Sequence, residues 1–109
     1  MHHEINERIR QEIGQNDIVL YMKGTAAFPQ CGFSAALAEV LNGLGIEYKD
    51  INVLSSPGLL QGIKEFSNWP STPQLYIKGE FVGGCDIVRE MATTGELQEL
   101  LAKKGLLPR

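Results

Sequence analysis

The sequence predicts an α/β fold in which a four-stranded mixed sheet is flanked by helices on both faces. In the first half of the chain, short apolar runs alternate with segments of helical periodicity, which is typical of a parallel strand–helix–strand unit. Farther along, two short strands are separated only by Lys78-Gly79, which is typical of an antiparallel hairpin. The 109 residues contain no internal repeat and no linker, so we expect one domain over residues 1–109.

The first half of the chain is expected to form two helices and two strands. Ile5, Ile9 and Ile13 recur at helical spacing. Gly14 and Gly45 are natural helix stops. The apolar run between the two helices is too short for a good helix and is typical of a buried strand. In order, we expect a helix at 3–13, a strand at 17–22, a loop at 23–30, a helix at 31–44 and a strand at 47–53.

The second half is expected to add three helices and the hairpin. Ser56-Pro57 is typical of an N-cap followed by proline in the first helical turn, and the segment 69–73 ends that helix. Asp86 is placed to cap a further helix, and Thr93 with Glu96 has the spacing of a capping box. In order, we expect a helix from Ser56 to Phe66, strands at 74–77 and 80–82, a helix from Asp86 to about Met91 and a helix from Thr93 to about Gly105.

Composition and charge exclude several classes of function. The formal net charge is −3, and no run of lysine and arginine occurs, so nucleic-acid binding is not expected. No apolar run approaches the roughly 20 residues that a membrane span needs. The N-terminus lacks a signal-peptide core and is too acidic for a transit peptide, which predicts a cytoplasmic protein. The two cysteines are therefore expected to be reduced, and they are too few for a structural zinc site.

Cys31 stands at the start of a predicted helix, where a redox motif often has a pair of cysteines. In a Cys-x-x-Cys pair the first thiolate attacks a disulfide and the second resolves the mixed disulfide. Here Ser34 holds the second place, and a serine hydroxyl cannot close a disulfide. The helix N-terminus and the charge of Lys23 favour a thiolate at Cys31. The alternative is that Cys31 is a small buried apolar side chain, although Gly24 and Pro29 favour an exposed turn.

Two later segments have the composition of a binding site for an extended peptide. A cis bond at Thr72-Pro73 would turn backbone groups outward for pairing with a peptide, whereas the alternative is an ordinary loop proline. Gly83-Gly84 lets a ligand approach the backbone, and the helix start beyond it offers N–H groups to a carboxylate. Asp86 either binds an ammonium group or caps the helix, and Cys85 either packs or acts as a second thiol. A tripeptide with a carboxylate at each end and one free amine would fit such a site.

Four motifs of the chain resemble those of the monothiol glutaredoxins of the CGFS type. They occur in the family's order, and the likeness extends from Asp17 to about Leu100. The motifs are Lys23-Gly24-Thr25, Cys31-Gly32-Phe33-Ser34, Trp69-Pro70-Ser71-Thr72-Pro73-Gln74-Leu75-Tyr76 and Gly83-Gly84-Cys85-Asp86. The resemblance implies a thioredoxin fold, a glutathione site, a bridging [2Fe-2S] cluster and partners of the BolA type.

The resemblance also implies a role for each matching position. Cys31 is the expected cluster ligand and glutathione-reactive thiol, with Lys23 beside the thiolate. The other positions expected to bind glutathione are Phe33 in the motif, Lys64 at the glycine carboxylate, Thr72 and the cis Pro73 at the cysteinyl backbone, and Cys85 and Asp86 at the γ-glutamyl end.

Two positions depart from the family's pattern. Leu60 stands a turn before Lys64, where the family often has an arginine, so a bidentate clamp on a carboxylate is missing. Ser71-Thr72 stands where an aromatic or larger apolar residue often precedes the proline. The binding of glutathione is therefore expected to depend more on Lys64 and on backbone groups.

A single reactive thiol predicts how a cluster would be held. A [2Fe-2S] cluster commonly takes four thiolates, which two copies of Cys31 and two glutathiones would supply. This arithmetic predicts a homodimer around a labile cluster, suited to cluster transfer to iron–sulfur client proteins and to iron homeostasis. One alternative is a glutathione-dependent thiol–disulfide oxidoreductase that removes glutathione from protein adducts. The other is a regulatory module whose main output is binding a BolA-type protein.

Overall fold

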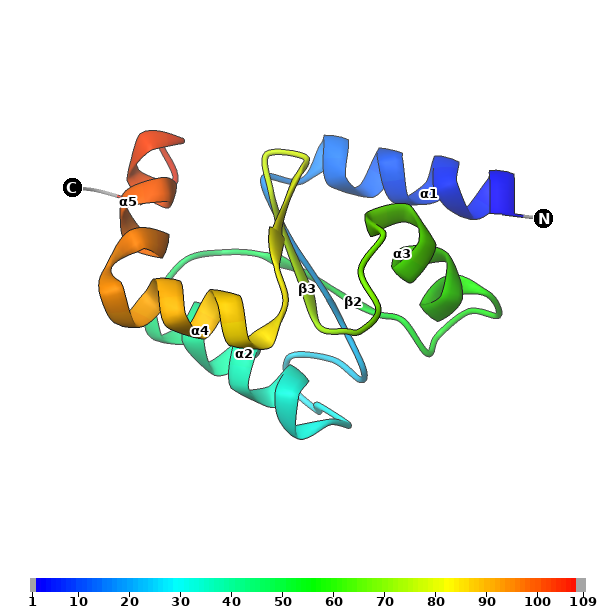
Figure 1. Cartoon of the computed structure of the whole chain (residues 1–109), viewed down its shortest axis with the longest axis horizontal. Coiled ribbons are helices and arrows are strands. Elements are labelled where there is room, and N and C mark those ends of the chain that lie inside the picture. Colours follow the sequence, from blue (N-terminus) through cyan, green and yellow to red (C-terminus); the bar gives the residue numbers. More distant parts are fainter. Residues whose placement is uncertain (1, 108–109) are drawn as a thin grey trace.

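The computed structural model describes residues 2–107 as a sheet with helices packed against both faces (Figure 1). The elements appear in the order expected from the sequence. Within these residues they are α1 (His2–Gln15), β1 (Ile18–Met22), α2 (Gly32–Gly43), β2 (Lys49–Asn52), α3 (Leu59–Ser67), β3 (Gln74–Ile77), β4 (Glu80–Gly83), α4 (Cys85–Thr94) and α5 (Glu96–Lys103).

The strand pairing confirms the mixed sheet expected from the sequence. The strands lie in the order β2-β1-β3-β4. β1 pairs parallel with β2 and antiparallel with β3, and β3 pairs antiparallel with β4. The hairpin turns at Lys78 and Gly79, whose φ angles of 52° and 80° match the twist of the two strands. The parallel pair therefore directs the C-terminal ends of β1 and β2 to the same edge of the sheet.

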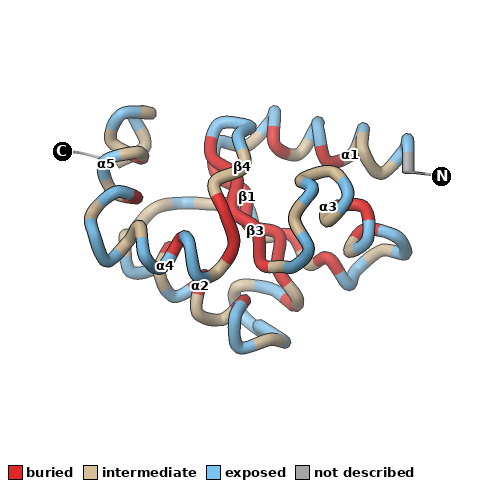
Figure 2. The backbone as a smooth tube through the Cα atoms, viewed as in Figure 1, coloured by how far each residue is buried: buried red, intermediate tan, exposed pale blue. Residues whose placement is uncertain are grey.

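Side chains of the central strand β1 alternate between two apolar layers. Ile18, Leu20 and Met22 belong to the layer shared with α2, α4 and α5. Val19 and Tyr21 belong to the layer shared with α1 and α3. Figure 1 shows the two helix groups on opposite sides of the sheet, and Figure 2 shows the buried residues concentrated along the strands and on the helix faces turned toward them. Each face of the sheet thus has its own core.

A polar network fastens α1 to the rest of its layer. The hydroxyl of the buried Tyr21 donates to Glu12 Oε1 at 2.8 Å, and Arg8 Nε donates to Glu12 Oε2 at 2.9 Å. Arg8 Nη1 also donates to Ser56 Oγ at 2.9 Å, which ties the segment after β2 to α1. Burial and the neighbouring Glu12 carboxylate raise the pKa of the Tyr21 hydroxyl far above its usual value.

The starts of α3 and α4 differ from the sequence prediction. Ser56 does not cap α3, because its hydroxyl is engaged by Arg8 and the chain first makes a turn through Gly58 at φ 80°. α3 therefore begins at Leu59. Asp86 is not the cap of α4 either, since Gly84 takes that position and Asp86 lies in the first turn.

Other boundaries also move. Thr93 does not open a capping box: it lies within α4, which runs past Met91 to Thr94, and its hydroxyl donates to the Arg89 carbonyl. Gly95, at φ 90°, separates α4 from α5. Gly14 does not end α1. β2 is shorter than the expected 47–53. No helix within residues 2–107 combines the length and the apolar character that crossing a membrane requires.

Candidate functional site

Cys31 occupies the N-cap of α2 and is half-exposed. The backbone N–H of Ser34 makes the largest contribution to lowering the pKa of its thiol, with further contributions from the Phe33 N–H, the Ser34 hydroxyl and the charge of Lys23. These contributions outweigh partial desolvation, which acts in the opposite direction. The arrangement favours a reactive thiolate and contradicts the alternative of a buried, inert cysteine.

Ser34 links the thiol to the end of β1. Its side chain is fully buried, and its Oγ accepts a hydrogen bond from the Lys23 backbone N–H at 3.0 Å. The residue in the place of a second cysteine therefore connects the first turn of α2 to the strand before it. This contact also holds the backbone of Lys23 close to Cys31.

The segment expected as a loop at 23–30 is a tightly closed turn. Gly24 has φ 84°, and a Cβ at this position would lie 2.5 Å from the Phe28 carbonyl oxygen and 2.6 Å from the Gln30 nitrogen. Thr25 and Phe28 exchange backbone hydrogen bonds, and Gln30 N–H donates to the Lys23 carbonyl at 3.0 Å. Only glycine fits at position 24 without moving this backbone.

Two polar residues of β2 hold this turn, and sequence reasoning missed both. Asp50 Oδ2 accepts from the Ala26 N–H at 2.8 Å. Asn52 Oδ1 accepts from the Gly24 N–H and from the Leu54 N–H, each at 3.0 Å. The available signal was a polar side chain on each side of Ile51, because alternate residues of a strand share one face. β2 therefore positions the turn that leads into Cys31.

A groove with a volume of about 200 Å³ lies between the start of α2, the segment before β3 and the start of α4. Of the residues expected to bind glutathione, it brings together Phe33, Thr72, Cys85 and Asp86. Lys23, Cys31, Lys64 and Pro73 are not among its lining residues. The full lining is Phe33, Trp69, Ser71, Thr72, Gly84, Cys85, Asp86 and Ile87.

The groove combines apolar walls with few polar groups. Trp69 packs on Phe81 with ring centroids 5.8 Å apart. Its Nε1 lies 3.0 Å from where a Cβ on Gly84 would stand, so Gly84 keeps this wall open. Asp86 is the one charged residue of the lining. The sequence analysis did not assign Trp69 or Ile87 to the site, although Trp69 is the first residue of the motif at 69–76.

The Thr72-Pro73 peptide bond is cis, as expected from the sequence. Pro73 is buried, and Thr72 is half-buried with its Oγ1 buried and without a hydrogen-bond partner. Cys85, the first residue of α4, is half-buried and is a free thiol, as is Cys31.

No lysine or arginine lines the groove. Lys64 is half-buried in the last turn of α3. Leu60 packs against the apolar layer of α1 and α3. The lining thus offers one carboxylate but no side-chain cation to a ligand.

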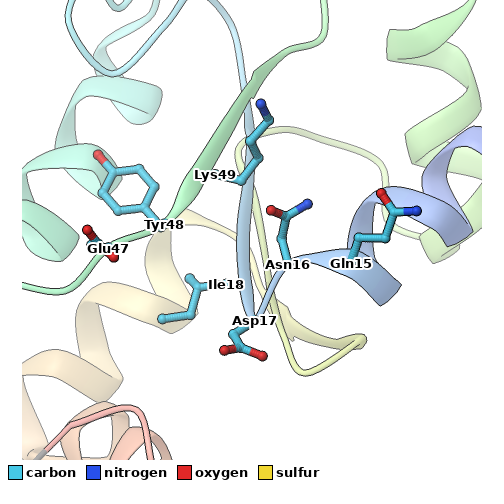
Figure 3. A pocket seen from close by; sticks show the side chains of 7 residues that line it. All are labelled: Gln15, Asn16, Asp17, Ile18, Glu47, Tyr48 and Lys49. Carbon is cyan, nitrogen blue, oxygen red and sulfur yellow. The ribbon is translucent and has the colours of Figure 1, made fainter.

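A second hollow of about 380 Å³ lies at the other end of the parallel strand pair (Figure 3). Its polar side chains fan outward and do not converge on one point. Asp17 pairs with Lys78 at 2.9 Å, and the Tyr48 hydroxyl donates to Asn42 at 2.9 Å. Because these groups are satisfied within the chain, we place the functional site at the groove beside α2. Residues 2–107 contain no group of three or more histidine, cysteine or acidic side chains arranged to hold a metal ion.

Comparisons with known proteins agree on one family. The glutaredoxin family model matches residues 18–82. Probable monothiol glutaredoxin 2 of Rickettsia felis is 53% identical over 95 residues, which are 87% of this chain and 91% of that protein. Monothiol glutaredoxin-5, mitochondrial, of Saccharomyces cerevisiae is 47% identical over 109 residues, which cover 96% of this chain and 73% of that protein.

Solved structures confirm the expected thioredoxin fold. A monomeric truncated mutant of Trypanosoma brucei 1-C-Grx1 matches with a TM-score of 0.81 at 40% identity, covering 100% of this chain and 96% of that one. A buckwheat glutaredoxin–glutathione complex matches with a TM-score of 0.85 at 21% identity, covering 97% and 94%. At that identity the buckwheat protein is evidence for the fold alone.

Proposed function

Because the chain belongs to the monothiol glutaredoxins, we propose that it binds glutathione beside Cys31 and carries a [2Fe-2S] cluster between two copies of itself. The observation that carries the proposal is the half-exposed thiol of Cys31 at the N-cap of α2, with a lowered pKa and a buried serine in place of a second thiol. Such a thiol needs a second sulfur from outside the chain, both for redox chemistry and for a four-thiolate cluster.

The groove has the groups that one end of glutathione requires. Asp86 offers a carboxylate to the free ammonium group of the γ-glutamyl residue. The neighbouring α-carboxylate would accept hydrogen bonds from the unpaired N–H groups in the first turn of α4. Lys64, outside the lining, is the side chain proposed for the glycine carboxylate.

Exposed aromatic rings flank the thiol. Phe28 is 79% exposed and Phe33 is 61% exposed, on either side of Cys31 in the sequence. Large apolar side chains exposed around a reactive group are typical of a surface that a partner covers. We assign this surface to the second copy of the chain when the cluster is bound, and to BolA-type or iron–sulfur client proteins during transfer. The cytoplasmic location expected from the sequence stays a prediction.

Anaerobic reconstitution tests the proposal. Protein is mixed with iron, sulfide and reduced glutathione, and absorption and mass in solution are measured. We expect a coloured dimer that requires both glutathione and Cys31, with Thr93→Ser, an exposed change outside the groove, as the control that keeps the cluster. A Cys31→Ser protein that holds a full cluster, or a wild-type cluster formed without glutathione, contradicts the ligand assignment.

The lowered pKa of Cys31 also favours a second candidate function. Cys31 thiolate would attack the glutathione sulfur of a protein–glutathione disulfide and release the protein thiolate. A second glutathione thiolate would then attack the Cys31–glutathione disulfide, which regenerates Cys31 and releases oxidised glutathione. Rapid turnover of a small glutathione mixed disulfide by cluster-free protein supports this function.

A further inference from the structure

Thr72 carries a buried hydroxyl that no group in the described part of the chain satisfies. Among residues 2–107, Thr72 Oγ1 and Gln98 Oε1 are the two buried side-chain polar atoms without a hydrogen-bond partner. A hydroxyl buried without a partner destabilises the folded state, and native proteins leave few such groups. An unpartnered hydroxyl therefore calls for a reason at its site.

The positions of the two atoms separate Thr72 from Gln98. Gln98 is not among the residues lining the groove, and its amide nitrogen donates to the Ala92 carbonyl at 3.2 Å. Thr72 lines the groove together with Cys85 and Asp86, on the segment that precedes β3. The residue that carries the unsatisfied hydroxyl is thus part of the wall that a ligand would touch.

We propose that Thr72 is a specificity-determining residue whose side chain turns about χ1 when glutathione enters the groove, so that its hydroxyl forms a hydrogen bond with a peptide group of the tripeptide. The inference rests on the proposed glutathione site. Threonine has more than one accessible χ1 rotamer, and its hydroxyl and methyl groups are similar in size. Rotation about χ1 takes the hydroxyl out of the dry position and toward the groove.

The surroundings determine how much this bond contributes. Phe33, Trp69 and Ile87 supply apolar walls to the groove, so a bound ligand would displace water from it. In such a site an amide of the ligand that forms no hydrogen bond weakens binding, because it has lost its water. A hydroxyl that hydrogen-bonds to this amide therefore favours ligands that have the amide. A peptide thiol should therefore gain from Thr72, whereas a thiol without a peptide bond should not.

Calorimetric titration of reduced glutathione into the cluster-free full-length chain tests the inference, with Thr72→Val, Thr72→Ser and wild type compared. Valine keeps the shape and removes the hydroxyl. We expect Thr72→Val to raise the Kd roughly three- to tenfold, the size of one neutral hydrogen bond, while its urea midpoint is unchanged or higher. Thr72→Ser keeps the hydroxyl and should stay within about twofold of wild type.

A second readout follows the rotation directly. Three-bond NMR couplings to the Thr72 methyl carbon report χ1, and we expect them to change when glutathione is added to wild type. If Thr72→Val does not fold, Thr72→Ala compared with Thr72→Ser isolates the same hydroxyl. Wild type that binds glutathione while the hydroxyl-free variants bind equally well overturns this inference alone. Wild type that binds no glutathione overturns the proposed function, and this inference with it.

Discussion

At the scale of single residues, Ser34 occupies the place of a second cysteine and supports the site through its hydrogen bonds. Its hydroxyl accepts the Lys23 N–H, and both its backbone N–H and its hydroxyl help lower the pKa of the Cys31 thiol. A second cysteine would be a weaker hydrogen-bond acceptor for that backbone group. With serine at position 34 no disulfide can form within the motif, but the same side chain stabilises both the Cys31 thiolate and the backbone at the end of β1.

Ser34→Ala tests this dual role. We expect the pKa of the Cys31 thiol to rise and the free energy of unfolding to fall by about 1 kcal/mol, because the part-buried Lys23 N–H loses its hydrogen-bond partner. Thiolate absorbance at 240 nm against pH, measured in a Cys85→Ser background, and urea unfolding check the two effects. Ser71→Ala, at an exposed position of the groove, is the matched control. An unchanged thiol titration contradicts the role of the hydroxyl.

Leu60 gives a gain-of-function prediction at the same scale. Arginine at this position, a turn before Lys64, would add a bidentate donor for the glycine carboxylate of glutathione. We expect Leu60→Arg to lower the glutathione Kd about three- to tenfold in a low-salt titration, since a charge-assisted bond near the surface is worth about 1 kcal/mol. Leu60→Met, which keeps the apolar packing, should bind as wild type does. Equal affinity in the arginine and methionine variants would show that position 60 lies outside the site.

Which site residues could be predicted from the sequence depended on how local their signals are. Phe33, Thr72, Cys85 and Asp86 stand in short motifs, and the structure brings them into one groove. Asp50 and Asn52 have no such motif: their role comes from the parallel pairing of β1 and β2, which places them beside a turn more than twenty residues earlier in the chain. Their contribution becomes visible only once strand register is known.

At the scale of elements, the strands and their order along the chain were predictable, whereas the starts of α3, α4 and α5 were not. The apolar run of β1 and the Lys78-Gly79 turn are determined by the residues themselves. Ser56 has the chemistry of a cap, but the distant Arg8 engages its hydroxyl and α3 starts later. Likewise Gly84 and Gly95 take the cap positions that Asp86 and Thr93 were expected to control. Capping residues predict a nearby helix start better than they predict its first residue.

The turn before Cys31 gives an element-scale prediction. Gly24→Ala forces a left-handed φ on a residue with a side chain and drives its Cβ into the backbone of Phe28 and Gln30. We expect a loss of about 2–4 kcal/mol in the free energy of unfolding, together with slower cluster assembly. Gly14→Ala is the control, because its Cβ meets nothing within 4 Å in a helix, and alanine there should be neutral or stabilising. Equal stability of the two variants would mean that the turn yields easily.

At the scale of the whole molecule, the two apolar layers have different roles. The groove is built on the layer of α2 and α4, together with the segment leading into β3. The layer of α1 and α3 holds the buried tyrosine network on the opposite face of the sheet. Burial raises the pKa of Tyr76 to about 12, and the hydroxyl of Tyr21 in the same layer has its pKa raised further still.

This layer predicts how stability responds to alkaline pH. A tyrosine whose pKa is higher in the folded than in the unfolded state stabilises the folded state fully at pH values below the unfolded pKa, here the ordinary value of 10.0. This stabilisation is lost progressively as the pH rises from the unfolded pKa toward the folded pKa. Between pH 8 and 11, we expect wild type to lose about 1 kcal/mol more stability than Tyr21→Phe, which has no proton to release there. Urea unfolding at the two pH values measures the difference. If wild type and Tyr21→Phe lose the same free energy of unfolding, a group other than Tyr21 causes the sensitivity to alkaline pH.

The alternation of β1 between the two layers has an evolutionary consequence. Removing or inserting a single residue within 18–22 would turn every later side chain of the strand to the other face of the sheet. Tyr21 would then lie on the face opposite its hydrogen-bond partner Glu12. Lineages descended from this chain can therefore vary these positions by substitution, while length changes should accumulate in the connecting segments.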